Sequence, residues 1–137
     1  MKIEQARLDD LEHLSQIDGE VSVGILERKI RDGEIFLIRN ELKILAYLRY
    51  SFFWDKVPFV NLLVVDSKER RKGLGSKIMH FWEERMERDG FNILMTSSQS
   101  DEEGQHFFKK LGYRIAGGFV FPNQADEIIL SKNLKER

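Results

Sequence analysis

Hydrophobic and polar residues follow two different rhythms along the chain, and these separate predicted strands from predicted helices. Short runs rich in branched and aromatic residues predict strands, whereas apolar residues three or four positions apart predict helices. The predicted strands cover residues 3–7, 35–39, 43–54, 59–65, 91–96, 113–120 and 127–130. Four helices are predicted. The first starts at Asp9, the second includes Ile25 to Ile30, and the third and fourth span residues 73–89 and 101–111.

This order, β-α-α-β-β-β-α-β-α-β-β, predicts the fold class. A tight turn at Asn40–Glu41 makes residues 35–54 a hairpin. The strand at 59–65 is apolar nearly throughout, which predicts burial on both of its faces. A helix and another strand follow it, and such a unit requires local parallel pairing. We therefore expect an α/β (α+β) fold with a mixed, mostly antiparallel twisted sheet and helices on both faces.

Composition narrows the function classes. The 137 residues predict a single domain over 1–137, and the net charge of -1 argues against nucleic-acid or membrane-surface binding by the chain as a whole. Without cysteine, disulfides and thiolate metal sites are excluded. We see neither a signal peptide nor an apolar run long enough to cross a bilayer, so we expect a cytoplasmic protein.

The segment from Val65 to Ser76 carries the clearest chemistry. A buried strand ends there, a basic turn follows, and a helix begins at Gly73 and Gly75. Free N–H groups and partial positive charge at a helix N-terminus favour an anion, and glycines let a ligand approach the backbone. The flanking cations are Lys68, Arg70, Arg71, Lys72 and Lys77. The segment therefore predicts a phosphate or pyrophosphate site, with a solvated basic helix start as the alternative.

Two common phosphate motifs do not fit this segment. The chain contains no G-x-x-x-x-G-K-[ST] loop. The pattern G-x-G-x-x-G fails because Ile78 stands where the third glycine is needed. A nucleotide-binding regulator therefore remains only a minor alternative.

At these residues the chain resembles the GNAT superfamily of acyltransferases. That family carries V-x-P-x-x-R-x-x-G-x-G/A between a strand and a helix, matched here by Val65, Arg70, Gly73 and Gly75, with Ser67 in the proline position. Seven residues of this chain fall at the spacing of a second family motif, N-x-x-A-x-x-F/L-Y-x-x-L-G-F/Y. These are Asp101, Gly104, Phe107, Phe108, Leu111, Gly112 and Tyr113.

The resemblance implies an N-acetyltransferase that uses acetyl-CoA. Backbone groups of Leu63, Val64 and Val65 would pair with the pantetheine arm, and the strands at 59–65 and 91–96 would splay to admit the thioester. Arg70 would flank the pyrophosphate held by Arg71, Lys72, Gly73, Leu74, Gly75 and Ser76. The helix from Asp101 would line the other side, and Lys109 or Lys110 would reach the ribose phosphate.

Two departures from the family pattern bear on catalysis. Phe108 stands where the family often has a tyrosine that protonates the departing thiolate, and phenylalanine has no proton to donate. Asp101 replaces the family asparagine and brings a negative charge toward an anionic cofactor. Tyr113 is a candidate acid by residue type, but it occupies the position of a packing aromatic, so we assign it to the core.

The reaction that the resemblance implies is direct attack by a neutral primary amine, which requires a base or a water chain. Asn61 lies on the strand before the turn and would position a water molecule. Glu34 and Asp126 are other possible bases, each with a surface carboxylate as the alternative interpretation. His13, His80 and His106 match no metal motif, so we predict no metal site. A non-catalytic acyl-CoA-binding or sensing module is the alternative function.

The acceptor is less defined than the cofactor. Aromatic residues gather between Tyr47 and Phe59, and alternate members should face opposite sides of the sheet. One half would belong to the core and the other half would line an acceptor pocket or a dimer face. We expect a small-molecule or peptide amine as acceptor and a homodimer through an apolar face near Trp54 as one form of assembly.

Overall fold

The computed structural model describes residues 1–101 and 103–136. The predicted element order is confirmed, with short 3₁₀ turns at Leu8–Asp10, Ser67–Glu69 and Leu134–Glu136. The strands are β1 (Lys2–Gln5), β2 (Ile35–Asn40), β3 (Lys43–Phe53), β4 (Val57–Val65), β5 (Ile93–Gln99), β6 (Arg114–Phe119) and β7 (Glu127–Asn133). The helices are α1 (Leu11–Ile17), α2 (Val23–Arg31), α3 (Leu74–Arg88) and α4 (Gly104–Lys110).

Within the described residues, hydrogen bonds link the strands in the order β1-β2-β3-β4-β5-β7-β6. The pair β4–β5 is parallel, and the pairs β1–β2, β2–β3, β5–β7 and β6–β7 are antiparallel. The expected mixed, mostly antiparallel sheet is therefore confirmed. No helix in the described part of the chain is long and apolar enough to cross a membrane.

The chain divides into two compact units, between which it passes more than once. The first unit comprises Met1–Tyr50 and Leu62–Trp82, and the second comprises Ser51–Asn61 and the chain from Glu83 onward. Strands β3 and β4 and helix α3 therefore each contribute residues to both units.

In the first unit, α1 and α2 cover one face of the strands and the start of α3 covers the other. Leu14 of α1 and Leu26 of α2 share a buried cluster with Leu37 of β2. Because side chains alternate along a strand, Phe36 of β2 points to the opposite face, where its ring meets Phe81 of α3 edge-on at 5.2 Å. Both apolar faces of this part of the sheet are thus buried, as the helical stripes in the sequence predicted.

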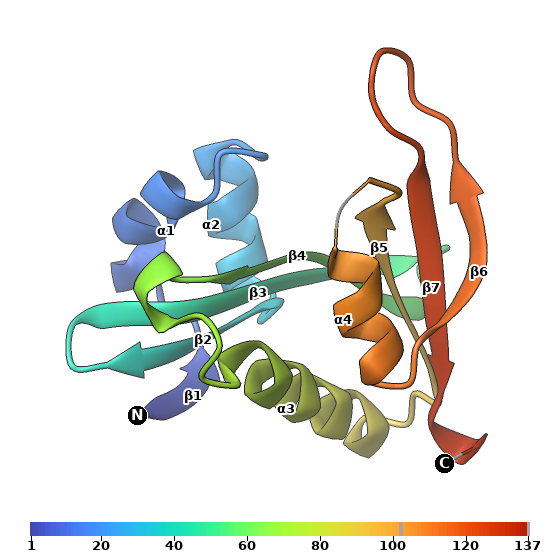
Figure 1. Ribbon diagram of the computed structural model, residues 1–137. Coiled ribbons are helices and arrows are strands. Elements are labelled where there is room, and N and C mark those ends of the chain that lie inside the picture. The colour runs from blue at the N-terminus through green and yellow to red at the C-terminus, as the bar shows by residue number, and fades with distance from the viewer. Residues whose placement is uncertain (102, 137) are drawn as a thin grey trace. The chain divides into compact units, whose positions relative to one another are not determined.

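The second unit is built around β5. β7 pairs with β5 along its whole length and with β6 on its other side, and these two strands form the long orange and red pair in Figure 1. The parallel pairing of β4 with β5 joins Phe59 to Met95 and Val60 to Thr96. The buried Thr96 hydroxyl donates to the Val60 carbonyl over 3.0 Å, which satisfies an acceptor at this end of the ladder.

Three local predictions were wrong. The hairpin turn is at Glu41–Leu42, because Asn40 still pairs with Lys43 and Glu41 adopts a φ of 56°. Burial of β4 on both faces fails beyond Val60, since Asn61 is exposed and the remaining residues of the strand are only half-buried. The final helix begins at Gly104 rather than Asp101, which lies in an exposed turn. Glu102, also within that predicted helix, lies outside the described residues.

Candidate functional site

The turn after β4 is held in place by hydrogen bonds of Asp66. The Asp66 N–H donates to the Leu45 carbonyl over 2.9 Å, so β4 remains bonded to β3 up to this residue. The Asp66 side chain then accepts the Lys68 N–H over 2.9 Å, and the backbone carbonyl of Asp66 accepts the Glu69 N–H over 2.8 Å. An acidic residue therefore starts the basic turn, because its carboxylate is an acceptor for an otherwise unpaired N–H.

The backbone then turns through left-handed conformations at two residues. Gly73 has φ 79°, as expected for a glycine at the start of the predicted site. Arg71 has φ 67°, which is uncommon for a residue with a side chain and is not signalled by the sequence. The residue type at 71 therefore does not account for this conformation.

Helix α3 directs the positive end of its dipole at this turn. The Lys77 N–H donates to the Gly73 carbonyl over 3.0 Å. By helix geometry, the preceding N–H groups of Leu74, Gly75 and Ser76 have no acceptor within the helix. With 15 residues, α3 is long enough to develop a macrodipole. A helix start with three such N–H groups is suited to an anion.

The basic side chains of the turn differ in how far they are compensated. Lys72 contacts Glu69 over 3.2 Å, and Lys43 lies 3.9 Å from Asp66. Arg70 and Arg71 are exposed, and within residues 1–101 and 103–136 neither forms a salt bridge or a side-chain hydrogen bond. Two guanidinium groups therefore remain available beside the free N–H groups.

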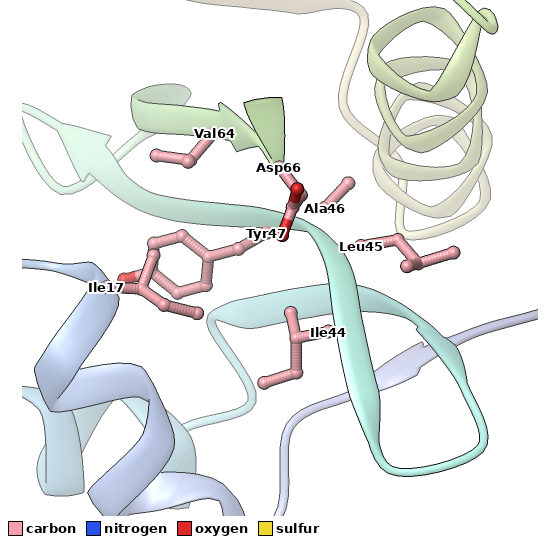
Figure 2. Close-up of a pocket in the computed structure, with 7 residues that line it drawn as sticks. All are labelled: Ile17, Ile44, Leu45, Ala46, Tyr47, Val64 and Asp66. Atoms are coloured by element: carbon pink, nitrogen blue, oxygen red, sulfur yellow. The ribbon is translucent and has the colours of Figure 1, made fainter. Parts of the chain in front are cut away.

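The strand residues predicted to meet a cofactor are all half-buried. Val64 packs against the cluster under α1 and α2, so by alternation Leu63 and Val65 point to the opposite face. A cavity of about 120 Å³ lies beside Val64 and Asp66, with Ile17 and Tyr47 on its other side (Figure 2). This volume is smaller than the ~300 Å³ at which ligand pockets begin, so the cavity is too small to enclose a coenzyme by itself.

In the second unit, α4 carries aromatic side chains but no proton donor in the position of the family tyrosine. Phe108 is buried, and its ring contacts those of Phe107 and Tyr113 at 5.2 and 5.9 Å between centroids. Gly104 lies so close to Ser98 that a Cβ atom would come within 2.9 Å of the Ser98 hydroxyl oxygen. Only a glycine fits there without a shift of the serine, which agrees with a glycine in the place where the second motif has alanine.

Tyr113 belongs to the core, as predicted from its position in the motif. It is buried, and its hydroxyl donates to Glu83 Oε2 over 2.7 Å. Burial raises the pKa of the Tyr113 hydroxyl, and the nearby Glu83 carboxylate raises this pKa further. Lys132 Nζ completes the group at 3.1 Å from Glu83 Oε1. A hydroxyl held in this way is a poor proton donor to a reacting group.

The sequence did not identify Glu83 as a buried partner of Tyr113. Glu83 lies in α3, four residues after the buried Met79 and three before the buried Met86. A carboxylate on this stripe was the available signal, because a charged side chain on a buried face requires partners. Its partners lie 30 and 49 residues away in the chain, and no local pattern points to them.

The residues that the sequence offered for removal of the amine proton are not brought together. Asn61 is exposed on β4, and Asp126 is exposed just before β7. Glu34 is engaged, since Lys29 Nζ lies 2.6 Å from its Oε1 and also donates to the Tyr50 carbonyl. The three histidines are exposed, and among the described residues no group of three or more His, Asp or Glu side chains is arranged to hold a metal ion.

Several solved structures share this fold at low sequence identity. Ard1 from Thermoplasma volcanium aligns with a TM-score of 0.83 at 15% identity, covering 97% of each chain. The ribosomal-protein-S18-alanine N-acetyltransferase from Escherichia coli gives 0.79 at 18% identity, covering 97% of this chain and 93% of that one. The NatC complex bound to Gag peptide and CoA gives 0.80 at 12% identity, covering 98% and 99%.

Sequence comparison defines the family independently of the fold. No curated protein sequence matches the chain. The model of the acetyltransferase (GNAT) family matches residues 4–113, which include β4, the turn at Asp66–Gly73, all of α3 and all of α4. The two sequence motifs, the anion site at the start of α3 and the sheet that carries it therefore have one explanation: the chain belongs to the acetyltransferase (GNAT) family.

Proposed function

We propose that the protein is an acetyl-CoA-dependent N-acetyltransferase that moves an acetyl group directly to a primary amine. The observation that carries this proposal is the turn between β4 and α3. It combines the free N–H groups at Leu74–Ser76 with the uncompensated guanidinium groups of Arg70 and Arg71. Family membership supports the same reading of this turn.

The residues of the turn fit a pyrophosphate. The N–H groups of Gly75 and Ser76 would hold its oxygens, and Arg70 and Arg71 would neutralise its charge. Lys72 would contribute less, because Glu69 already lies 3.2 Å from its ammonium group. Backbone groups of Leu63–Val65 would hold the pantetheine arm. Acetyl-CoA, when bound, supplies the activated acetyl thioester.

The acceptor that we propose is the primary amine of a peptide or of a small molecule. Peptides come first, because two structural neighbours are named for an alanine of a ribosomal protein and for a complex with a Gag peptide. An alkyl amine is mostly protonated at neutral pH, so it must lose a proton before it attacks. Asn61 cannot accept that proton as a base, but its exposed amide would position a water molecule that does.

Protonation of the leaving thiolate needs no side chain in this scheme. Phe108 has no proton to donate, and the Tyr113 hydroxyl already donates to Glu83. A thiol has an ordinary pKa of about 8.5, so its thiolate is a tolerable leaving group near neutral pH. Solvent would supply the proton after the sulfur has departed.

The same two residues favour one second candidate, a non-catalytic acyl-CoA-binding or sensing module. Such a module needs the anion site at the start of α3 but neither a base nor an acid. It predicts binding of acetyl-CoA without release of free thiol in the presence of any amine.

Calorimetric titration with acetyl-CoA, beside ATP and NAD, tests the cofactor. We expect saturable binding of acetyl-CoA alone, abolished in Gly75→Glu because a carboxylate would enter the anion site. Gly24→Glu is the matched control, since Gly24 is an exposed residue in the first turn of α2. Absence of acetyl-CoA binding by the folded wild-type protein would refute both candidate functions.

Thiol release separates the two candidates. The wild-type protein is incubated with acetyl-CoA and a panel of peptides with free N-termini, amino acids and small alkyl amines. Release of coenzyme A with matching acetylation of an amine by mass spectrometry supports the transferase. Tight binding with no turnover across the panel supports the module.

A further inference from the structure

A second basic site lies in the second unit, separate in sequence from the turn before α3. A hollow of about 540 Å³ is lined by the end of α4, the start of β6 and the end of β7. Its cationic residues are Lys109, Lys110, Arg114 and Lys132, and its one acidic residue is Glu136. Such a volume is in the range of small-molecule sites, roughly 300–1,000 Å³.

The four cations are not equivalent. Lys132 is neutralised, because its ammonium group lies 3.1 and 3.2 Å from the two oxygens of the buried Glu83. Lys109, Lys110 and Arg114 are exposed, and the described parts of the chain offer none of them a salt bridge. Three uncompensated positive charges and one carboxylate, that of Glu136, thus line the hollow in a protein whose net charge is -1.

Helix electrostatics account for only part of this cluster. Lys109 and Lys110 lie in the last turn of α4, where cations interact favourably with the carbonyl end of any helix. Arg114 gains nothing from that effect, because it lies in β6 beyond the Gly112 turn, paired in register with Ser131 of β7. Its charge joins the same hollow from a different element.

The floor of the hollow is fixed by buried contacts. Tyr113 lies between Gly112 and Arg114 in the chain, and its ring and hydroxyl are held by Phe108 and Glu83. The side chain of Lys132 passes close to Gly112, where a Cβ atom would come within 3.3 Å of the lysine Cε. The backbone that carries Arg114 is therefore preorganised, and a ligand would not have to order it.

We propose that this hollow binds a small phosphate-bearing anion with at least two negative charges. The guanidinium of Arg114 suits two phosphate oxygens at once, and the lysines and the Ser131 hydroxyl add point donors. A concave site enclosed by three elements fits a compact ligand better than an extended nucleic-acid strand, which needs a continuous basic stripe. Lys109 and Lys110, which the resemblance assigned to the ribose phosphate of the coenzyme, serve this second ligand instead, and the inference does not rest on the transfer reaction.

Inorganic tripolyphosphate is the probe, and backbone amide chemical shifts on the full-length protein are the readout. We expect saturable shifts at Gly112, Arg114 and Lys132. Arg114→Gln and the double variant Lys109→Gln, Lys110→Gln should each weaken the affinity measured at these amides by ~10-fold, since each removes charge-assisted hydrogen bonds. These side chains are exposed, so the variants should fold, as their amide spectra will show.

Two controls separate a built site from general attraction to positive charge. Arg88→Gln removes an exposed arginine from the last turn of α3 and should leave the affinity unchanged. Arg71→Gln should affect only shifts in the turn before α3, whatever the fate of the acetyl-CoA proposal. The inference is wrong if shifts at residues 109–114 do not saturate, or if Arg88→Gln weakens them as much as Arg114→Gln. It is equally wrong if a single-stranded RNA oligonucleotide shifts these amides and tripolyphosphate does not.

Discussion

Each compact unit contains a buried carboxylate that accepts hydrogen bonds from a tyrosine hydroxyl and from a cation. The two groups differ in the segments that they connect and in how exposed the cation is. In the first unit, Asp18 Oδ2 accepts the Tyr47 hydroxyl over 2.5 Å and Arg49 Nε over 2.8 Å. In the second, Glu83 accepts the Tyr113 hydroxyl over 2.7 Å and Lys132 Nζ over 3.1 Å. The same chemistry therefore stabilises two parts of one protein.

The difference lies in how far each cation is removed from water. The Arg49 side chain is 6% exposed and that of Asp18 is 0% exposed, whereas Lys132 is 16% exposed. Asp18 also accepts the Glu20 N–H over 3.0 Å, so it fixes the connection between α1 and α2 on β3. A buried pair is costly to break when the remaining charge cannot reach water, and Arg49 is the more confined of the two cations.

Replacement of Asp18 by alanine should therefore have the largest effect. It leaves the buried guanidinium of Arg49 with only the exposed Glu20 as a partner, at 3.0 Å, and we expect a loss of about 3–5 kcal/mol of unfolding free energy. Urea denaturation followed by circular dichroism measures it. Glu12→Ala, which removes an exposed acid from α1, should change stability by no more than about 0.5 kcal/mol. A similar loss in both variants would show that Asp18 has no special role.

Replacement of Glu83 by alanine should cost less, about 1–3 kcal/mol. The long Lys132 side chain can turn its ammonium group to solvent, so the unsatisfied group that remains is chiefly the Tyr113 hydroxyl. The same denaturation experiment applies, with the exposed neighbour Glu84→Ala as the matched control. If Glu83→Ala proves more destabilising than Asp18→Ala, exposure of the cation does not govern the cost of breaking these groups.

Removal of each hydroxyl alone should have a modest effect on stability. Tyr47→Phe and Tyr113→Phe each lose one hydrogen bond and should cost about 1 kcal/mol. Tyr113→Phe should also leave the rate of thiol release unchanged. A general acid would instead contribute on the order of 100-fold or more to that rate, so a fall of this size would reassign Tyr113 to catalysis.

Alkaline pH should have the smallest effect on stability, and the tyrosines of both units should contribute to it. Burial, followed by the neighbouring carboxylate, raises the pKa of Tyr47 and of Tyr113 above the ordinary value of 10.0. Their contribution is complete below that value and is lost as pH rises toward the folded-state pKa values, because only the unfolded chain releases these protons. Stability of the wild-type protein should fall by about 1 kcal/mol just above pH 10, and less in the double variant Tyr47→Phe, Tyr113→Phe.

The sequence predicted the elements well because their signals are local. The stripe of Leu74, Ile78 and Trp82 predicts α3, and the glycines at 33, 90 and 112, all with positive φ, predict chain reversals. The parallel pairing of β4 with β5 followed from the strand–helix–strand unit, and the pairing of β2 with β3 followed from the hairpin. The turn between β4 and α3 was predictable for the same reason, since its glycines and cations are adjacent in the chain, while its role as an anion site stays a prediction.

Long-range pairing was not predictable. Asp18 and Arg49 are 31 residues apart, and Glu83 and Lys132 are 49 apart, so each appears in the sequence as an ordinary surface charge. Burial of β4 was overestimated because an apolar run reports composition and not the cover over each residue. The positive φ of Arg71 escaped prediction because it runs against the preference of its residue type.

The weaving of the chain between its two units has a consequence for synthesis on the ribosome. The first unit lacks Leu62–Trp82 until that stretch has emerged, and the second needs β5, β6 and β7, which follow it in the chain. The first unit can therefore close before the second has all of its strands, carrying Ser51–Asn61 as a segment whose partners have not yet emerged. The turn between β4 and α3 would therefore be assembled early, before the last strands of the second unit.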